Sequence, residues 1–261
     1  TYTMRQKRSC PYVMLALENL RLYRDLKLRL KRSRRRPRGK KSRLRLKNEL
    51  EMVIPENLND TRSLRKRIAR EAAFLIYTSQ EKEYKQAKRK AAEILGVRIL
   101  PSNREVADEL DAIAEEIEGK ARLKRLLRMR KEALEIMRCL EDYEPRLIGS
   151  VWRGTAHKNS DIDITVFSHD PRDVLKRIAK SNFKIIKVEE NVIAEGEDKR
   201  STFHIHLTLP SGDEAEIVVR DPRDRMKDEI CEIYGDVIKG LSLIELKKIL
   251  KSDPYRRFVP E

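Results

Sequence analysis

Residues 148–164 read IGSVWRGTAHKNSDIDI and join a glycine-serine bend to two closely spaced carboxylates. The apolar pair before Gly149-Ser150 predicts a short strand, and Asp161-Ile-Asp163 opens a second strand ten residues after the bend. Side chains two positions apart on a strand project from the same face. Two adjacent carboxylates repel each other unless a cation neutralises them. Their hard oxygen ligands suit Mg²⁺, which binds through one or two carboxylates plus substrate phosphates.

The bend and the loop after it supply groups that suit a triphosphate. Gly149 lacks a Cβ, so the backbone can turn tightly and bring its N–H groups close to phosphates. The Ser150 hydroxyl can donate to a phosphate oxygen. Further candidate donors in the loop are Arg153, Thr155, Lys158 and Ser160.

This segment resembles the signature of the DNA polymerase β nucleotidyltransferase superfamily, which is Gly-Ser, ten residues, then Asp-x-Asp. The pieces Arg153-Gly-Thr155 and Ser160-Asp161 look like those of archaeal minimal nucleotidyltransferases and of the catalytic domain of CCA-adding enzymes. The directly matched residues are about 148–166, with a looser likeness to about residue 220. The alternative is an Asp-rich strand edge beside an ordinary turn. It is disfavoured because two charged residues on an Ile/Val strand need a reason to be there.

The resemblance implies a third carboxylate on a later strand. The candidates are Glu214 and Glu216, which share one face while Ala215, Ile217 and Val219 share the other. Glu216 lies deeper in the strand and is the preferred ligand, although family members often use Asp there. The resemblance therefore implies catalytic and metal-binding roles for Asp161, Asp163 and Glu216.

Two further observations stay open at the level of sequence. His204 and His206 share the face of Glu216 if the hairpin turn at 211–213 has three residues. They then either line the substrate cleft or form an exposed polar sheet face. Trp152, the one tryptophan, either stacks on a base or closes the loop over the core.

Outside this segment the hydrophobic period predicts an α+β architecture. Three helices are expected: from about Leu64 to Leu95 with a break near Thr78, from Ser102 to Gly119, and from Ala121 to Tyr143. After Arg146 the pattern changes to about five strands in a mixed sheet with two helices. The predicted domains are a basic extension at 1–60, a helical region at 61–144 and a polymerase β-like nucleotidyltransferase domain at 145–261.

Positive charge is concentrated at the start of the chain. Residues 1–60 hold 18 Lys+Arg and 6 Asp+Glu, a net +12, which leaves 16 − 12 = +4 for the rest. Such a block attracts polyanions, above all nucleic-acid phosphates. It is interpreted as an RNA-binding arm, a solvated tail or an accessory extension. The candidate nucleic-acid contacts are Arg34, Arg35, Arg36, Arg38, Lys40 and Lys41.

The amino-acid composition indicates the cell compartment of the protein and its adaptation to heat. Charged residues make up 39% of the chain, against about 25% in ordinary globular proteins, and fit a heat-adapted protein. Three scattered cysteines without metal-ligand spacing indicate free thiols in a reducing compartment. With neither a secretory signal nor an apolar run long enough for a membrane span, the sequence predicts a cytoplasmic protein with no membrane partner.

The implied activity is the Mg²⁺-dependent transfer of a nucleoside monophosphate from an NTP to a hydroxyl acceptor, with two ions expected. RNA is the favoured acceptor because of the basic segment. One alternative is a protein-modifying enzyme that adds AMP, as minimal nucleotidyltransferases paired with helical partners do. A small-molecule acceptor is another alternative, and a catalytically inactive nucleic-acid-binding protein on the same scaffold is the last.

Overall fold

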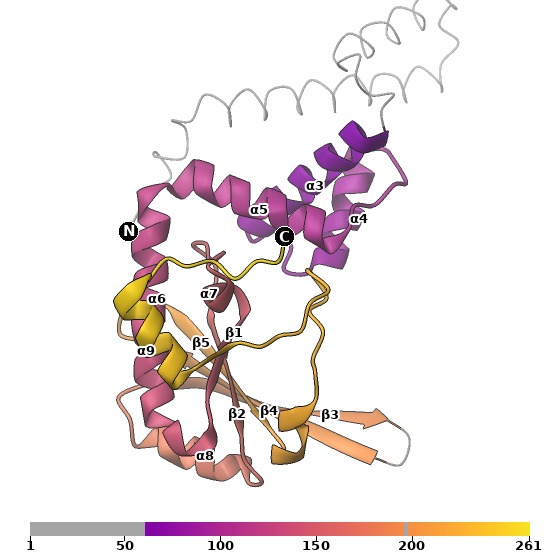
Figure 1. Cartoon of the computed structure of the whole chain (residues 1–261). Coiled ribbons are helices and arrows are strands. Elements are labelled where there is room, and N and C mark those ends of the chain that lie inside the picture. Colours follow the sequence, from indigo (N-terminus) through magenta and orange to yellow (C-terminus); the bar gives the residue numbers. More distant parts are fainter. Residues whose placement is uncertain (1–60, 196–197) are drawn as a thin grey trace, which may run out of the picture. The chain divides into compact units, whose positions relative to one another are not determined.

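The computed structural model describes residues 61–195 and 198–261, and these contain a six-stranded mixed sheet (Figure 1). Its strands are β1 (Arg146–Ile148), β2 (Ile162–Phe167), β3 (Lys184–Glu195), β4 (Asp198–Thr208), β5 (Glu214–Arg220) and β6 (Leu241–Ser242). They lie in the order β3-β4-β5-β2-β1-β6. Only β2 and β5 run parallel, and every other neighbouring pair is antiparallel. The predicted α+β class is confirmed, with six strands rather than about five.

The helices of the described residues follow the predicted order. They are α3 (Thr61–Tyr77), α4 (Tyr84–Leu95), α5 (Asn103–Glu118), α6 (Lys120–Cys139), α7 (Gly149–Arg153), α8 (Pro171–Ala179) and α9 (Leu243–Ser252). The break after Tyr77 falls where the sequence places it. Gly96 ends α4 in a left-handed conformation, and Ser102 caps α5 in a capping box with Glu105.

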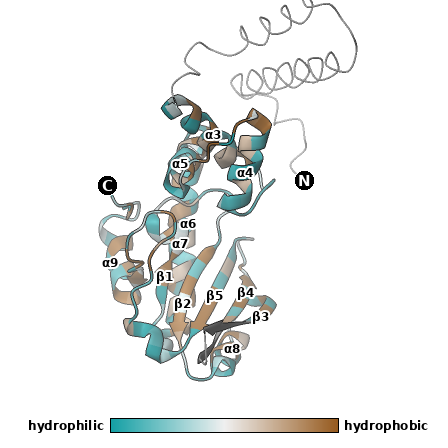
Figure 2. Cartoon of the chain, turned by 90° about the vertical axis from the view of Figure 1, so that its right-hand side faces the viewer, coloured by the Kyte–Doolittle hydropathy of each residue, from teal (hydrophilic) through white to brown (hydrophobic). Residues whose placement is uncertain are grey.

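One face of the sheet is covered by α6, α8 and α9, and the main core lies between them. The alternating apolar residues of β2 and β5, among them Ile164 and Ile217, pack there with Met129 and Ile136 of α6. Figure 2 shows this hydrophobic character along β2. The opposite face therefore receives the polar residues of the same strands, because strand side chains alternate.

Helices α3, α4 and α5 build a second apolar layer ahead of α6. Ile68, Ala72 and Ala91 are fully buried in it, as are Val106 and Ala114 of α5. A division of the chain at residue 144 stays a prediction. Helix α6, which precedes that point, contributes directly to the core of the sheet. Residues 1–60, with the predicted basic extension, lie outside the described residues.

Candidate active site

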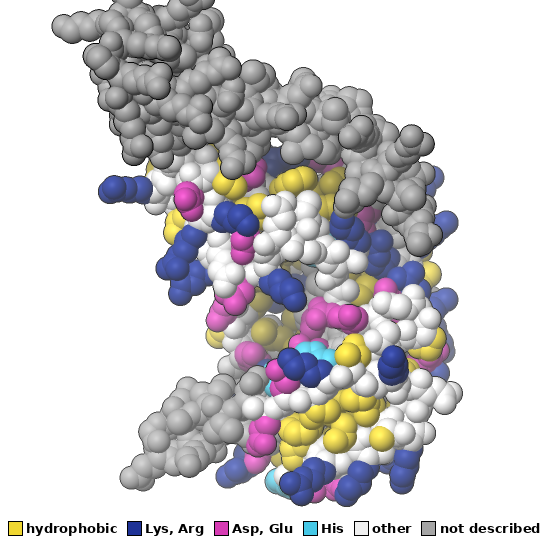
Figure 3. Space-filling view, turned by 180° about the vertical axis from the view of Figure 1, so that it is seen from behind, with side chains coloured by type: hydrophobic (Ala, Val, Ile, Leu, Met, Phe, Trp, Pro, Cys, Tyr) yellow, Lys and Arg dark blue, Asp and Glu magenta, His cyan; other side chains and the backbone are white. Residues whose placement is uncertain are grey.

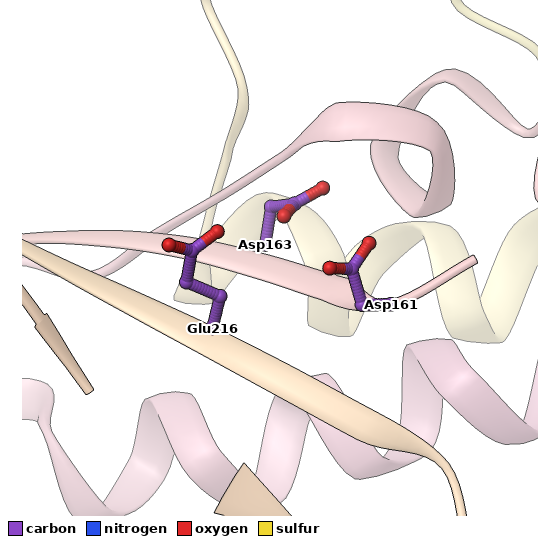
Figure 4. A group of neighbouring side chains, drawn as sticks. All are labelled: Asp161, Asp163 and Glu216. Carbon is purple, nitrogen blue, oxygen red and sulfur yellow. The ribbon is translucent and has the colours of Figure 1, made fainter. Parts of the chain in front are cut away.

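Three carboxylates meet on the face of the sheet opposite α6, α8 and α9. Asp163 on β2 is the direct partner of Glu216 on β5 in the parallel pair, and Asp161 precedes β2 by one residue. One oxygen from each of these three side chains lies within 4.8 Å of the others. Figure 4 shows the three side chains rising from the same side of the two strands. Glu214, the other candidate third carboxylate, is not part of this group.

Electrostatics at this acidic cluster (Asp161, Asp163 and Glu216) favour a bound cation. Burial raises the pKa of Asp163 well above its ordinary value, and the neighbouring charges of Asp161 and Glu216 raise it further. Desolvation also raises the pKa of Asp161, although that residue as a whole is exposed, because its carboxyl is turned toward the other two. Hard oxygen ligands held this close are the donor set that Mg²⁺ prefers.

The glycine-serine bend lies directly against the cluster. Ile148 pairs with Asp163 across β1 and β2, and the chain then turns at Gly149, with φ +67°, into the short helix α7. A Cβ on Gly149 would lie 1.8 Å from Oδ2 of Asp163. Ser150 and Thr155 line a cavity of about 160 Å³ next to the bend. Seen from behind, the molecule is hollowed near its middle, and acidic, basic and histidine side chains border the hollow (Figure 3).

The remaining predicted phosphate contacts are engaged within the protein. The Arg153 side chain is almost fully buried and donates 2.7 and 3.0 Å hydrogen bonds to Asp236 and a 2.9 Å hydrogen bond to the carbonyl of Phe258. We therefore leave Arg153 out of the proposed nucleotide contacts. Lys158 places its ammonium 4.4 Å from the centre of the Tyr77 ring, and the Ser160 hydroxyl oxygen accepts a 3.0 Å hydrogen bond from the amide of His157.

Two buried arginines of α6 hold the loop, and sequence reasoning missed both. Arg130 donates to the carbonyls of Val151 and Trp152, and Arg122 donates to those of Thr155 and Ala156. Both lie on the same stripe of α6 as the buried residues Leu126, Ala133 and Met137. An arginine at a core-facing helical position was the signal that could have found them, because a buried charge needs partners.

The contacts of Trp152 and of the two histidines place Trp152 in the core and the histidines beside Glu216. Trp152 is 5% exposed, lies in the main core and stacks on Phe258 with ring centres 6.4 Å apart. His206 pairs with Glu216 across β4 and β5, so the histidines share its face. His204 lies within 2.6 Å of Glu216, and His206 Nε2 lies 3.2 Å from Oε2 of Glu189.

Comparison with known families agrees with this site. The family model described as "Nucleotidyltransferase domain" matches residues 128–237, which include the bend and all three carboxylates. Residues 128–237 therefore match a nucleotidyltransferase domain, which confirms the nucleotidyltransferase part of the resemblance drawn from the sequence. The match begins within α6, the helix whose arginines hold the loop.

Solved structures share only a part of the chain. A structure of Cid1 in complex with its short product ApU is 20% identical, with 38% of this chain and 32% of that chain covered and a TM-score of 0.27. A cytoplasmic RNA terminal U-transferase is 21% identical, with 45% of this chain and 34% of that chain covered and a TM-score of 0.23. A chain of the GLD-2/RNP-8 complex is 14% identical, with 40% of this chain and 42% of that chain covered and a TM-score of 0.25.

This chain thus spans about a third of the length of the first of these structures. These TM-scores are low, and the nucleotidyltransferase assignment of residues 128–237 comes from the family model. No curated protein matches the sequence. Among the described residues, no helix has the length and apolar character needed to cross a membrane.

Proposed function

We propose that this chain is a Mg²⁺-dependent nucleotidyltransferase that transfers a nucleoside monophosphate from an NTP to a hydroxyl acceptor and releases pyrophosphate. One observation carries the proposal. The carboxylates of Asp161, Asp163 and Glu216 converge within 4.8 Å of one another, inside the segment that matches the nucleotidyltransferase family. The Gly149-Ser150 bend, which suits phosphates, touches the same cluster.

The chemistry of the cluster fits Mg²⁺. Asp161, Asp163 and Glu216 would hold the metal, and two ions would neutralise the charge that develops on the transferring phosphoryl group. The raised pKa of Asp163 supports this assignment, because a buried carboxyl among other carboxyls is costly to ionise without a cation.

The protein's own groups bind and orient the substrates. The backbone N–H groups at Gly149 and the hydroxyl of Ser150 bind phosphate oxygens, with Thr155, Lys158 and Ser160 as further candidates. The acceptor oxygen attacks the α-phosphorus, the bond to the bridging oxygen breaks and pyrophosphate leaves. Glu216 either takes the proton of the attacking hydroxyl or serves only as a metal ligand.

RNA is the acceptor that we favour. The net charge of +12 over residues 1–60 supports a polyanionic partner, since basic segments gain affinity by releasing counterions from phosphates. AMP transfer to a protein is the other outcome that the experiment below can return.

The test supplies the full chain and Mg²⁺ with each of the four NTPs, labelled at the α-phosphate, together with fractionated RNA or protein. We expect a labelled RNA. Label in the protein fraction instead would replace RNA by protein as the acceptor.

Two variants give the controls. Asp161→Ala/Asp163→Ala removes two carboxylates of the cluster and is expected to abolish labelling. Glu214→Gln changes an exposed acid on the same strand as Glu216 and is expected to leave labelling intact. Equal labelling by wild type and the double variant would refute the catalytic role of the cluster.

A further inference from the structure

Glu216 is held on its far side by a histidine of the neighbouring strand. Nδ1 of His204 lies 2.6 Å from Oε1 of Glu216, and both side chains are largely enclosed, with 20% and 25% of their surfaces exposed. The contact is diagonal across β4 and β5, because the direct partner of Glu216 is His206. Such a contact links the third carboxylate to a strand that carries no other member of the acidic cluster.

The surroundings of His204 determine where its proton lies. When Glu216 is ionised, its carboxylate only accepts hydrogen bonds, and the short contact then needs a proton on Nδ1. In the neutral ring Nε2 is then an acceptor, and it lies 3.1 Å from the hydroxyl oxygen of Thr202. In that state the Thr202 hydroxyl donates to Nε2, and Nδ1–H donates to Glu216.

This chain of hydrogen bonds matters because glutamate is long. Its side chain has more rotatable bonds than that of aspartate, so an unsupported Glu216 would sample positions away from Asp161 and Asp163. A hydrogen bond to one carboxylate oxygen selects a single arrangement and leaves the other oxygen for the cluster. Mutation of a group that orients a metal-ligating side chain in this way typically lowers metal affinity or activity by about 10–100-fold.

We propose that His204 is a positioning residue that fixes Glu216 within the acidic cluster, and that the Thr202 hydroxyl completes this arrangement by donating to Nε2. This inference rests on the proposed function for its catalytic consequence, although its geometric part does not. His206 provides the contrast, because its Nε2 lies 3.9 Å from Glu216 Oε1, beyond hydrogen-bond distance.

The test uses three substitutions that separate the two ring nitrogens. In His204→Asn the amide nitrogen can take the place of Nδ1, in His204→Gln it falls nearer Nε2, and His204→Leu offers no donor. With Mn²⁺ as the probe, followed by the electron paramagnetic resonance of the free ion, we expect binding to weaken about 10–100-fold in the Leu and Gln variants. We expect the Asn variant to stay within a few-fold of wild type.

Three further measurements make the result specific. Thermal unfolding of each variant shows whether it is folded, and His169→Leu, at an exposed position before α8, serves as the control. Nitrogen NMR of the imidazoles in the metal-free full chain should report His204 with its proton on Nδ1. Thr202→Val removes the donor to Nε2 but leaves the contact to Glu216, so the proton should stay on Nδ1.

Either of two results would overturn the proposal: equal Mn²⁺ affinity in wild type and His204→Leu, or a wild-type His204 protonated only on Nε2. A wild-type chain that binds Mn²⁺ with this pattern but transfers no nucleotide would refute the proposed function and leave the role of His204 standing.

Discussion

Gly149 and Asp163 occupy positions so close that no side chain fits between them. A Cβ on Gly149 would lie 1.8 Å from Oδ2 and 2.8 Å from Cγ of Asp163, and φ at Gly149 is +67°. Two features thus prevent any residue other than glycine from occupying position 149: the positive φ of its backbone and the Asp163 carboxylate that faces it. The closeness also places the backbone of the bend beside the acidic cluster.

Gly149→Ala is expected to abolish nucleotidyl transfer and Mn²⁺ binding, because the new methyl group must displace the Asp163 carboxylate. Gly212→Ala is the matched control. Gly212 also has a positive φ, +87°, but a Cβ there meets nothing within 4 Å. Both variants bear about 1–2 kcal/mol of backbone strain, so their difference isolates the clash. Chemical unfolding and labelling assays measure it, and equal loss in the two variants would contradict the argument.

The sequence predicted those elements of this protein that depend on local patterns of neighbouring residues. Alternation in β2 and β5, the end of a helix at Leu95 and the start of the next at Ser102 follow local signals, and the structure has each of them. Strand β6 was missed because its two residues form a strand only by pairing with β1, far away in sequence.

Long-range pairing also explains what was missed around the site. Arg153 lies in the signature loop and was predicted to bind phosphate, yet Asp236 and Phe258, about a hundred residues later, hold it. Arg130 was not predicted at all, since its partners at 151, 152, 254 and 256 are all carbonyls, and every residue has one. Local spacing cannot identify such partners.

Arg130→Met should destabilise the protein strongly. Its guanidinium is fully buried, and burial lowers its pKa to about 10, so it stays charged at neutral pH and binds the four carbonyls. Removing it strands those acceptors, at about 1–3 kcal/mol for each buried group left unsatisfied. Arg128→Met on the same helix removes a half-exposed pair with Asp213 and should cost no more than about 1 kcal/mol.

Urea unfolding of the full chain measures both variants. We also expect Arg130→Met to lose more activity than stability alone explains, because the carbonyls of Val151 and Trp152 follow directly after the Gly149-Ser150 bend. Equal free energies of unfolding for the two variants would show that the buried arginine is not what holds the loop.

The basic segment yields a prediction about salt. Replacing Arg34, Arg35, Arg36, Arg38, Lys40 and Lys41 by Gln should weaken RNA binding and flatten its dependence on salt concentration. The slope of log K against log [salt] should fall by about 0.7 for each lost contact to a single strand. Fluorescence anisotropy over a salt series measures the slope. An unchanged slope would exclude these six residues as the phosphate contacts.

The cluster itself should make metal-free protein less stable as the pH rises. Burial and two neighbouring carboxylates raise the pKa of Asp163 in the folded state above its unfolded value of about 3.9. The folded state then holds the proton more tightly than the unfolded state. The contribution of Asp163 to the free energy of unfolding is therefore complete below pH about 4 and is lost as the pH rises through the raised pKa. Asp163→Asn cannot ionise and should escape this loss.

In the absence of metal, Asp163→Asn should therefore have a higher Tm than wild type at neutral pH, with the gap closing as the pH falls. Mg²⁺ should reverse the order, since a ligand at 100 times its Kd stabilises by about 2.7 kcal/mol and the variant has lost one ligand. Asp142→Asn, at an exposed position, should follow wild type throughout. Parallel pH profiles for wild type and Asp163→Asn would mean that ionised Asp163 does not destabilise the metal-free folded state, and that the acidic cluster does not need a cation.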